Sequence, residues 1–158
     1  MAKEIERKFL VKDESYKDMA YASKVVKQGY ICCANKKTVR IRTMNDKAYL
    51  TIKGPSDEAG LGRYEWEHEI PMDEAIELMR LCEPGMIDKT RYLVKSGNHI
   101  VEVDEFHGEN DGLVMAEIEL RYEEEEYERP DFLSEEVTGD PRFYNSFLRQ
   151  FPFSKWKK

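Results

Sequence analysis

The sequence predicts an α+β protein built on an eight-stranded antiparallel β-barrel, with flanking helices and a C-terminal helix. About eight segments alternate apolar with polar or charged side chains, as strands do when one face packs against a core. Short turns join several of these segments, which favours antiparallel pairing, and helical patterns occur as insertions between them. A length of 158 residues favours a single domain over residues 1–158.

Composition excludes several classes of protein. The net charge of −7 disfavours general binding to nucleic acid or to anionic membranes. No apolar run approaches the length of a membrane span, and the first residues lead directly into charges without a signal-peptide pattern. Three cysteines form an odd set without metal-ligand spacing. We therefore expect a reduced cytoplasmic protein.

The first expected strand, residues 3–11, carries a pattern that later strands repeat. Its apolar face holds Ile5, Phe9 and Val11, and its charged face holds Glu4, Glu6 and Lys8. A solvated strand could show the same alternation. The repetition along the chain argues for a charged face with a common purpose.

The remaining elements follow in order. A helix is expected over residues 13–23, then strands over 24–33, 38–44, 47–53 and 63–70, with a loop over 54–62. Asp73 is expected to cap a second helix, which Pro84 and Gly85 end. Strands then cover 87–95, 99–106 and 113–122. After Asp140-Pro141, Phe143, Phe147 and Phe151 recur at helical spacing, which indicates packing that closes one end of the sheet.

The charged strand faces are sorted by sign. The third, fourth and sixth strands carry only cations, the fifth, seventh and inner part of the eighth carry only anions, and the first carries both. The cations are Lys8, Arg40, Arg42, Lys53, Lys89 and Arg91. The anions are Glu4, Glu6, Glu65, Glu67, Glu102, Asp104, Glu117 and Glu119.

Two arrangements are compatible with these faces. Charged faces usually meet solvent, so the apolar faces could form an ordinary sandwich with ion pairs outside. The sorting by sign over so many strands favours a charged barrel interior instead. Burying so many ions is prohibitive unless they pair with one another or with a ligand. A cationic wall suits a polyanion and an acidic wall suits a hard divalent cation, so the pattern predicts a polyphosphate together with Mg²⁺ or Mn²⁺.

The ordered motifs identify a family resemblance. Glu4-x-Glu6-x-Lys8 resembles the ExExK motif of the CYTH superfamily, the triphosphate tunnel metalloenzymes. The likeness covers nearly the whole chain and is carried by residues 39–42, 50–54, 65–67, 89–91, 102–104 and 117–119 in family order. The tail around residues 137–145 is similar to that of short bacterial members.

The resemblance implies roles for these residues. The fold would be a tunnel in which Lys8, Arg40, Arg42, Lys53, Lys89 and Arg91 bind the triphosphate. Glu4, Glu6, Asp104, Glu117 and Glu119 would hold the metal, and Glu4, Glu6, Lys8 and Glu119 are the predicted catalytic residues. Glu65, Glu67 and Glu102 match acidic tunnel positions without an assigned role.

The expected activity is metal-dependent hydrolysis of a triphosphate, with inorganic tripolyphosphate cut to pyrophosphate and phosphate. The alternatives are a class IV adenylate cyclase, a thiamine triphosphatase and a non-catalytic binder of polyphosphate or nucleotide. The expected partner is a small-molecule triphosphate, and no binding to nucleic acid or membrane is expected. The sequence does not decide between a monomer and a homodimer.

Overall fold

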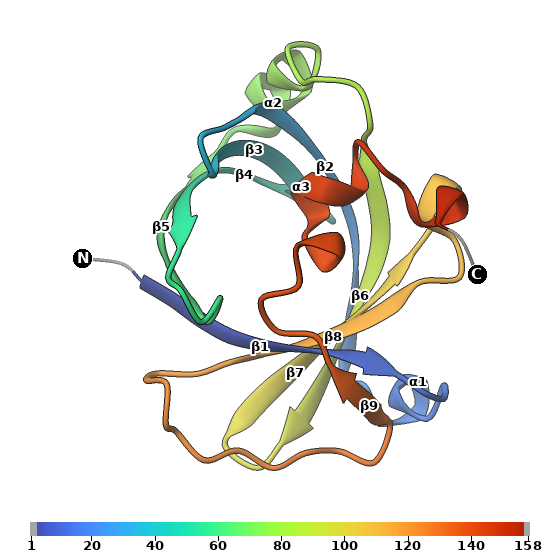
Figure 1. Ribbon diagram of the computed structural model, residues 1–158. Helices are drawn as coiled ribbons and strands as arrows, with labels where there is room; N and C mark the ends of the chain where they lie inside the picture. Colours follow the sequence, from blue (N-terminus) through green and yellow to red (C-terminus); the bar gives the residue numbers. More distant parts are fainter. Residues whose placement is uncertain (1–2, 157–158) are drawn as a thin grey trace.

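The computed structural model describes residues 3–156 and contains a closed antiparallel β-barrel (Figure 1). Its strands are β1 (Lys3–Val11), β2 (Ala22–Ala34), β3 (Lys37–Met44), β4 (Lys47–Ser56), β5 (Gly62–Ile70), β6 (Ile87–Ser96), β7 (His99–Phe106), β8 (Val114–Glu119) and β9 (Leu133–Glu136). The helices are α1 (Tyr16–Met19), α2 (Met72–Met79) and α3 (Asn145–Leu148). Short 3₁₀ turns cover Gly108–Asn110, Pro141–Phe143 and Phe153–Lys155.

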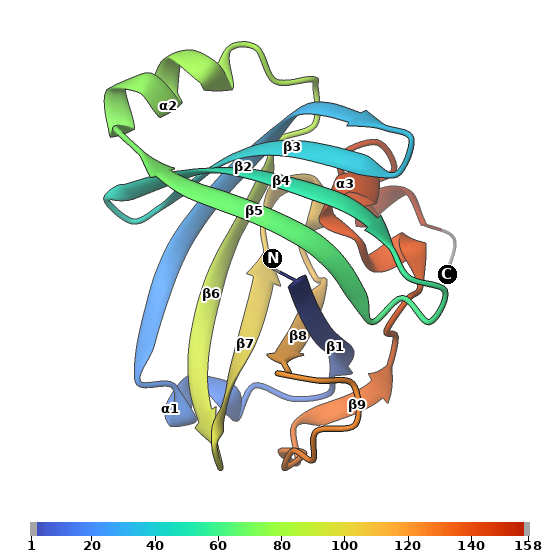
Figure 2. The ribbon, with the colours of Figure 1, turned by 90° about the vertical axis from the view of Figure 1, so that its left-hand side faces the viewer.

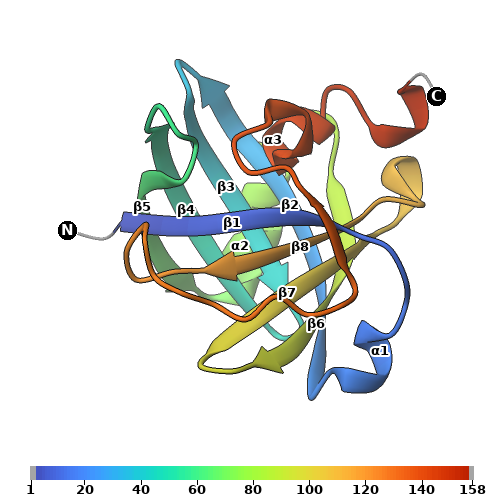
Figure 3. The same cartoon turned by 60° about the horizontal axis from the view of Figure 1, so that its bottom comes forward.

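The barrel closes through β1, which pairs with β8 on one side and with β5 on the other. The order is β5-β4-β3-β2-β6-β7-β8-β1, and β1 then pairs with β5. β1 lies between β5 and β8 (Figure 3). At the closing seam Glu4 of β1 is the register partner of Arg63 of β5. The predicted eight-stranded barrel is therefore confirmed. The short strand β9, which pairs with the far half of β1, lies outside the eight and was not predicted.

The helices are shorter than the sequence suggests, so the protein is mostly β. The expected helix over residues 13–23 is wrong in extent, because the chain is already extended at Ala20 and Tyr21 N donates to Leu93 O at the edge of the sheet. The expected cap at Asp73 is also wrong, since Pro71 occupies the cap position of α2 and Asp73 lies in its first turn. Asp140 caps the turn that follows it, accepting from Arg142 N at 3.1 Å.

Apolar residues on the outer faces of the strands form two clusters. One cluster covers β1 and β6–β8 and includes Phe9, Val103 and Ile118, packed beneath Tyr16 and Phe132. The other lies under α2, which crosses the outside of β3 and β4 (Figure 2), and includes Ile41, Ala48 and Ala75. Because the outer faces supply this core, the charged faces point inward. No helix within residues 3–156 is long and apolar enough to cross a membrane.

The inner face is not charged along its whole length. Towards one end it becomes apolar, and the C-terminal segment packs there, so that Leu10, Phe106, Met115, Phe143 and Leu148 belong to one cluster. The predicted closing role is confirmed for Phe143, which is buried. Phe151, by contrast, stays exposed, with its ring against that of Phe147. The charged cavity is thus bounded at one end of the barrel by an apolar cluster, which we call the apolar floor.

A glycine allows the C-terminal segment to dock. Gly85 has a φ of +99°, and a Cβ placed there would lie 2.1 Å from the carbonyl oxygen of Arg149. The Arg149 guanidinium then binds Glu83 at 2.8 Å. The close approach therefore holds α3 at the end of the barrel.

Replacing Gly85 tests this docking against a matched control. Gly108 also has a positive φ, +63°, but nothing lies within 4 Å of the Cβ it would carry. Gly108→Ala should cost about 1–2 kcal/mol of unfolding free energy from backbone strain alone. Gly85→Ala should cost about 1–3 kcal/mol more, because Arg149 or the loop must also move. Urea unfolding measures both, and equal losses would show that the contact with Arg149 is unimportant.

Candidate active site

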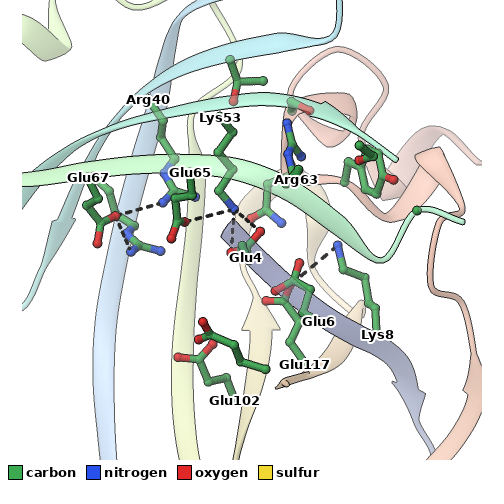
Figure 4. Close-up of a pocket in the computed structure, with 18 of the residues that line it drawn as sticks. Glu4, Glu6, Lys8, Arg40, Lys53, Arg63, Glu65, Glu67, Glu102 and Glu117 are labelled. Carbon is green, nitrogen blue, oxygen red and sulfur yellow. Dashed lines mark hydrogen bonds and ion pairs between the residues drawn. The ribbon is translucent and has the colours of Figure 1, made fainter. Parts of the chain in front are cut away.

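A cavity of about 240 Å³ lies inside the barrel and is lined almost entirely by polar side chains. Among residues 3–156, seven of its lining residues are basic: Lys8, Arg40, Arg42, Lys53, Arg63, Lys89 and Arg91. Seven are acidic: Glu4, Glu6, Glu65, Glu67, Glu102, Glu117 and Glu119. Figure 4 shows these side chains converging from strands on different sides of the cavity. The predicted residues therefore share one compartment, with the exception of Asp104.

The strand order gathers the two signs into two continuous arcs. Because β2 pairs with β6, the basic strands β3, β4 and β6 lie along one run of the barrel wall. Because β1 closes onto β5, the acidic strands β5, β7 and β8 join through Glu4 and Glu6 of β1. Two basic residues, Lys8 and Arg63, stand within the acidic arc. The cavity thus presents a basic arc opposite an acidic one.

The basic arc is rich in positive charge that the protein compensates only partly. Arg40 and Arg42 both turn to one carboxylate, that of Glu67, with nitrogen–oxygen distances of 3.5 and 3.3 Å. Thr51 donates to the same carboxylate at 2.5 Å. Burial, together with the charges of Arg40 and Arg91, lowers the pKa of Arg42 to about 10. An anion in the cavity would relieve this repulsion.

Asp104 lies beneath two cations of β6, which cover it and separate it from the cavity. Its two oxygens accept from Arg91 at 2.8 and 3.0 Å, and Lys89 Nζ lies 2.8 Å from one of them. The carboxylate is buried, and although burial favours its neutral form, Arg91 and Lys89 hold its pKa below the usual range. With its oxygens bonded to cations, Asp104 orients basic groups in this arrangement and does not line the cavity.

Lys89 is the most deeply buried of the basic groups. Its side chain is 2% exposed, and burial lowers the pKa of its ammonium to about 8 despite the neighbouring Asp104. Arg91 is held from several sides, since Glu102 and Glu117 lie 3.3 and 3.5 Å from its nitrogens. Both cations therefore have fixed positions at the boundary between the arcs.

The acidic arc carries carboxylates that repel one another. Burial, followed by the charges of Glu117 and Glu4, raises the pKa of Glu6 well above its ordinary value. Glu117 is the opposite case: burial favours its neutral form, but Lys8, a hydrogen bond from Glu6 and Arg91 together lower its pKa well below the usual range. Lys8 Nζ lies 3.9 Å from Glu117 and donates to the carbonyl oxygen of Phe143 at 3.0 Å.

Lys53 neutralises the part of the acidic arc nearest to it. Its ammonium lies 3.0 Å from Glu4 and 3.6 Å from Glu65, between the two carboxylates (Figure 4). Within residues 3–156, no ion pair is formed by Glu119, and partial burial with the charges of Glu4, Glu102 and Glu65 raises its pKa. The acidic arc therefore retains repulsion that a cation would relieve.

Sequence reasoning missed several residues of the cavity wall. Arg63, which the sequence analysis did not include among the cavity cations, lines the cavity and lies over the ring of Tyr144 at 6.0 Å. Tyr144, Asn145 and Ser146 arrive from the C-terminal segment, and Tyr30 comes from β2. The three residues of the C-terminal segment carry no charge alternation, so only the docking of the tail reveals them. Arg63 differs, because it lies two residues before Glu65 on β5 and the strand alternation places both on one face.

Glu105 and the three histidines lie outside the cavity. Glu105 points to the outside, where it bonds Tyr16 and Lys17. The three histidines lie apart from the cavity: His68 stacks on Trp66, His99 faces Glu125, and His107 bonds Thr90. The three cysteines carry free thiols.

The donor set fits a hard divalent cation. Glu4, Glu6, Glu117 and Glu119 offer oxygen atoms only, as Mg²⁺ and Mn²⁺ prefer. Within residues 3–156, no three acidic, histidine or cysteine side chains already stand together in a metal-binding arrangement. Magnesium is usually held by one or two carboxylates with phosphate oxygens and water, so the acidic arc suits a metal that arrives with a phosphate ligand.

Comparison with known proteins gives a consistent result. The CYTH domain model matches residues 2–144. An inorganic triphosphatase of Acetivibrio thermocellus is 48% identical over 159 aligned positions, covering 100% of both chains. An inorganic triphosphatase of Nitrosomonas europaea is 32% identical, covering 92% of this chain and 95% of its own. A crystal structure of an inorganic triphosphatase superposes with a TM-score of 0.67 at 29% identity, covering 94% and 95% of the two chains.

The different surroundings of Glu117 and Glu119 predict opposite effects of removing their charges. A raised carboxyl pKa means that ionisation opposes folding at neutral pH, so Glu119→Gln should raise the melting temperature there. The gain should shrink as the pH falls towards the ordinary carboxyl pKa, about 4.3. A lowered pKa means that ionisation supports folding, so Glu117→Gln should lower the melting temperature at neutral pH.

Scanning calorimetry at pH 7.5 and at pH 4.5 measures these shifts in the absence of metal and phosphate. Glu109→Gln, on an exposed turn outside the cavity, is the control and should change little. Stabilisation by Glu117→Gln, or destabilisation by Glu119→Gln, at pH 7.5 would contradict the charge assignment.

Proposed function

Because the chain belongs to the CYTH domain family, we propose that it is an inorganic triphosphatase that hydrolyses tripolyphosphate to pyrophosphate and phosphate. The relatives that match over nearly their full length are inorganic triphosphatases, and one of them shares 48% of its residues with this chain. The observation that carries the proposal is the cavity itself, in which a basic arc faces an acidic arc.

The basic arc is the proposed phosphate site. Its members Arg40, Arg42, Lys53, Lys89 and Arg91 would bind the phosphates together with Lys8, which stands within the acidic arc. Hydrolysis of a phosphoanhydride needs positioning and neutralisation of charge more than covalent participation by the protein. Buried guanidinium and ammonium groups whose positive charges repel one another supply such neutralisation in a region that water screens weakly.

The acidic arc is the proposed site of a divalent cation, Mg²⁺ or Mn²⁺, held by Glu4, Glu6, Glu117 and Glu119. When bound, such a cation neutralises negative charge on phosphate oxygens. Asp104 is left out of this set, because Arg91 and Lys89 occupy its oxygens. In this structure the ammonium group of Lys53 neutralises Glu4. If the Lys53 side chain turned towards a phosphate, the Glu4 carboxylate would be free to bind the cation.

The remaining carboxylates of the cavity orient the cations that would bind phosphate. The proposed catalytic residues are Glu4, Glu6, Lys8 and Glu119. Glu67 steadies Arg40 and Arg42, as Glu65 steadies Lys53 and Glu102 steadies Arg91. We assign these three carboxylates to orienting cations, which leaves the Glu4 side of the cavity for the metal.

A neighbouring hollow makes the choice of substrate a matter for experiment. It has a volume of about 380 Å³, opens beside the cavity at Tyr144, and is also lined by Cys33, Lys36 and Pro141. The turn before β3 and the C-terminal segment build this hollow together. A nucleotide could place its organic part there.

Product analysis tests the proposal directly. Tripolyphosphate should yield pyrophosphate and phosphate with Mg²⁺ or Mn²⁺, ATP should be hydrolysed more slowly, and little or no cyclic AMP should form. Holding the ribose hydroxyl in line would require positioning worth several kcal/mol, for which the charged walls provide no specific contact. Chromatography of the products under identical metal conditions measures all three.

Two controls sharpen this experiment. Addition of EDTA should abolish turnover, and Arg40→Met should reduce the rate by about 10²-fold or more, because it removes charge that opposes the phosphates. Conversion of ATP to cyclic AMP and pyrophosphate, with tripolyphosphate left intact, would refute the triphosphatase proposal in favour of a cyclase.

A further inference from the structure

We propose that Asn145 is a positioning residue that directs the ammonium group of Lys89 at the substrate, an inference that rests on the proposed function. Asn145 is the first residue of α3, in a part of the chain that lies far in sequence from Lys89 on β6. Figure 1 shows α3 at the end of the barrel beside β2 and β6. Both Asn145 and Lys89 line the cavity.

The side-chain oxygen of Asn145 accepts two hydrogen bonds. Lys89 Nζ donates to it at 2.8 Å, and Gln28 Nε2 donates to it at 3.1 Å. An ammonium group can only donate, so the Asn145 amide must turn its oxygen towards Lys89. Its NH₂ group is then directed away from Lys89, and the orientation of the amide is set by chemistry.

The same logic fixes Gln28, which is fully buried on β2. Because Asn145 presents an oxygen, Gln28 must present its NH₂ group, which also lies 3.3 Å from the hydroxyl oxygen of Tyr30. Its own side-chain oxygen is left without a hydrogen-bond partner among residues 3–156. An arrangement that leaves a buried acceptor unpaired indicates that the Asn145–Lys89 bond decides the orientation of both amides.

Asn145 and Asp104 hold the ammonium of Lys89 from two different parts of the chain. Asp104 binds it from β7 at 2.8 Å, and Asn145 binds it from the C-terminal segment at the same distance. An ammonium has three N–H donors, so these two acceptors leave one for a phosphate oxygen in the cavity. Without Asn145, Lys89 would be drawn towards the full charge of Asp104.

The segment that carries Asn145 is firmly seated. Leu148 and Phe143 are buried in the apolar floor, and Arg149 binds Glu83. The Phe143 carbonyl also accepts from Lys8, so the same segment touches two of the proposed phosphate ligands. The C-terminal segment thereby aligns cations that the barrel strands alone would leave less constrained.

Binding of tripolyphosphate in EDTA, measured by titration calorimetry, tests this role without depending on turnover or metal. Asn145→Ala should weaken binding about tenfold, the effect of losing one hydrogen bond to a charged group. Asn145→Asp has nearly the same shape but adds a carboxylate beside Lys89, which should weaken binding more than alanine does. A purely structural role for Asn145 would give the opposite order.

A double-mutant cycle with Lys89→Met isolates the pair. If Asn145 acts through Lys89, Asn145→Ala should weaken binding less than twofold once Lys89 is already methionine. Arg142→Ala is the matched control, since Arg142 lies on the same segment and bonds Asp140 outside the cavity. It should leave binding within twofold of the wild type.

The outcomes separate this inference from the function on which it rests. Wild-type protein that binds tripolyphosphate, with Asn145→Ala unchanged or Asn145→Asp the better binder of the two, overturns the positioning role alone. If Asn145→Ala still weakens binding tenfold in the Lys89→Met background, the positioning role is overturned as well. Wild-type protein that does not bind tripolyphosphate overturns the proposed function and this inference together.

Discussion

A barrel whose inner face is charged must neutralise that charge inside itself. The protein does so only in part. At the boundaries between the two arcs the compensation is good, as in the pairs of Lys53 with Glu4 and of Arg91 with Asp104. Away from the boundaries, burial and the like charges that face one another together shift the pKa values of Arg42, Glu6 and Glu119. The remaining imbalance has the two signs that a phosphate chain and a divalent cation would supply.

The separation of the arcs depends on topology. Strands β3, β4 and β5 follow one another through hairpins, but β2 pairs with β6 across more than fifty residues and β1 closes the barrel onto β5. Without the first pairing, the cations of β3 and β6 would lie on separate walls. Without the second, Glu4 and Glu6 would not join the carboxylates of β5. The same closure seats the C-terminal segment at the end of the barrel, where it reaches Lys89 and Lys8.

Alternation was sufficient to predict much of this. The bounds of β1 and β7 match the expected ranges, and the predicted inward residues line one cavity except for Asp104. The pattern could not show that Asp104 is covered and does not line the cavity, because this depends on how the Arg91 side chain folds over it. Nor could it show Asn145 or Gln28, which are neutral and reach the site through tertiary docking. The helix over 13–23 failed because sheet pairing at Tyr21 prevailed over local helical preference.

The central claim is that the basic and acidic arcs form one site, and mutual dependence of their ligands tests it most directly. The measurement is the affinity for a non-hydrolysable imido analogue of tripolyphosphate with and without Mn²⁺, corrected for the complex that the two form in solution. Linkage requires that Mn²⁺ and the analogue strengthen each other by the same factor. The account predicts about tenfold or more, within the usual range for coupled sites. Independent binding, or competition between the two, would contradict it.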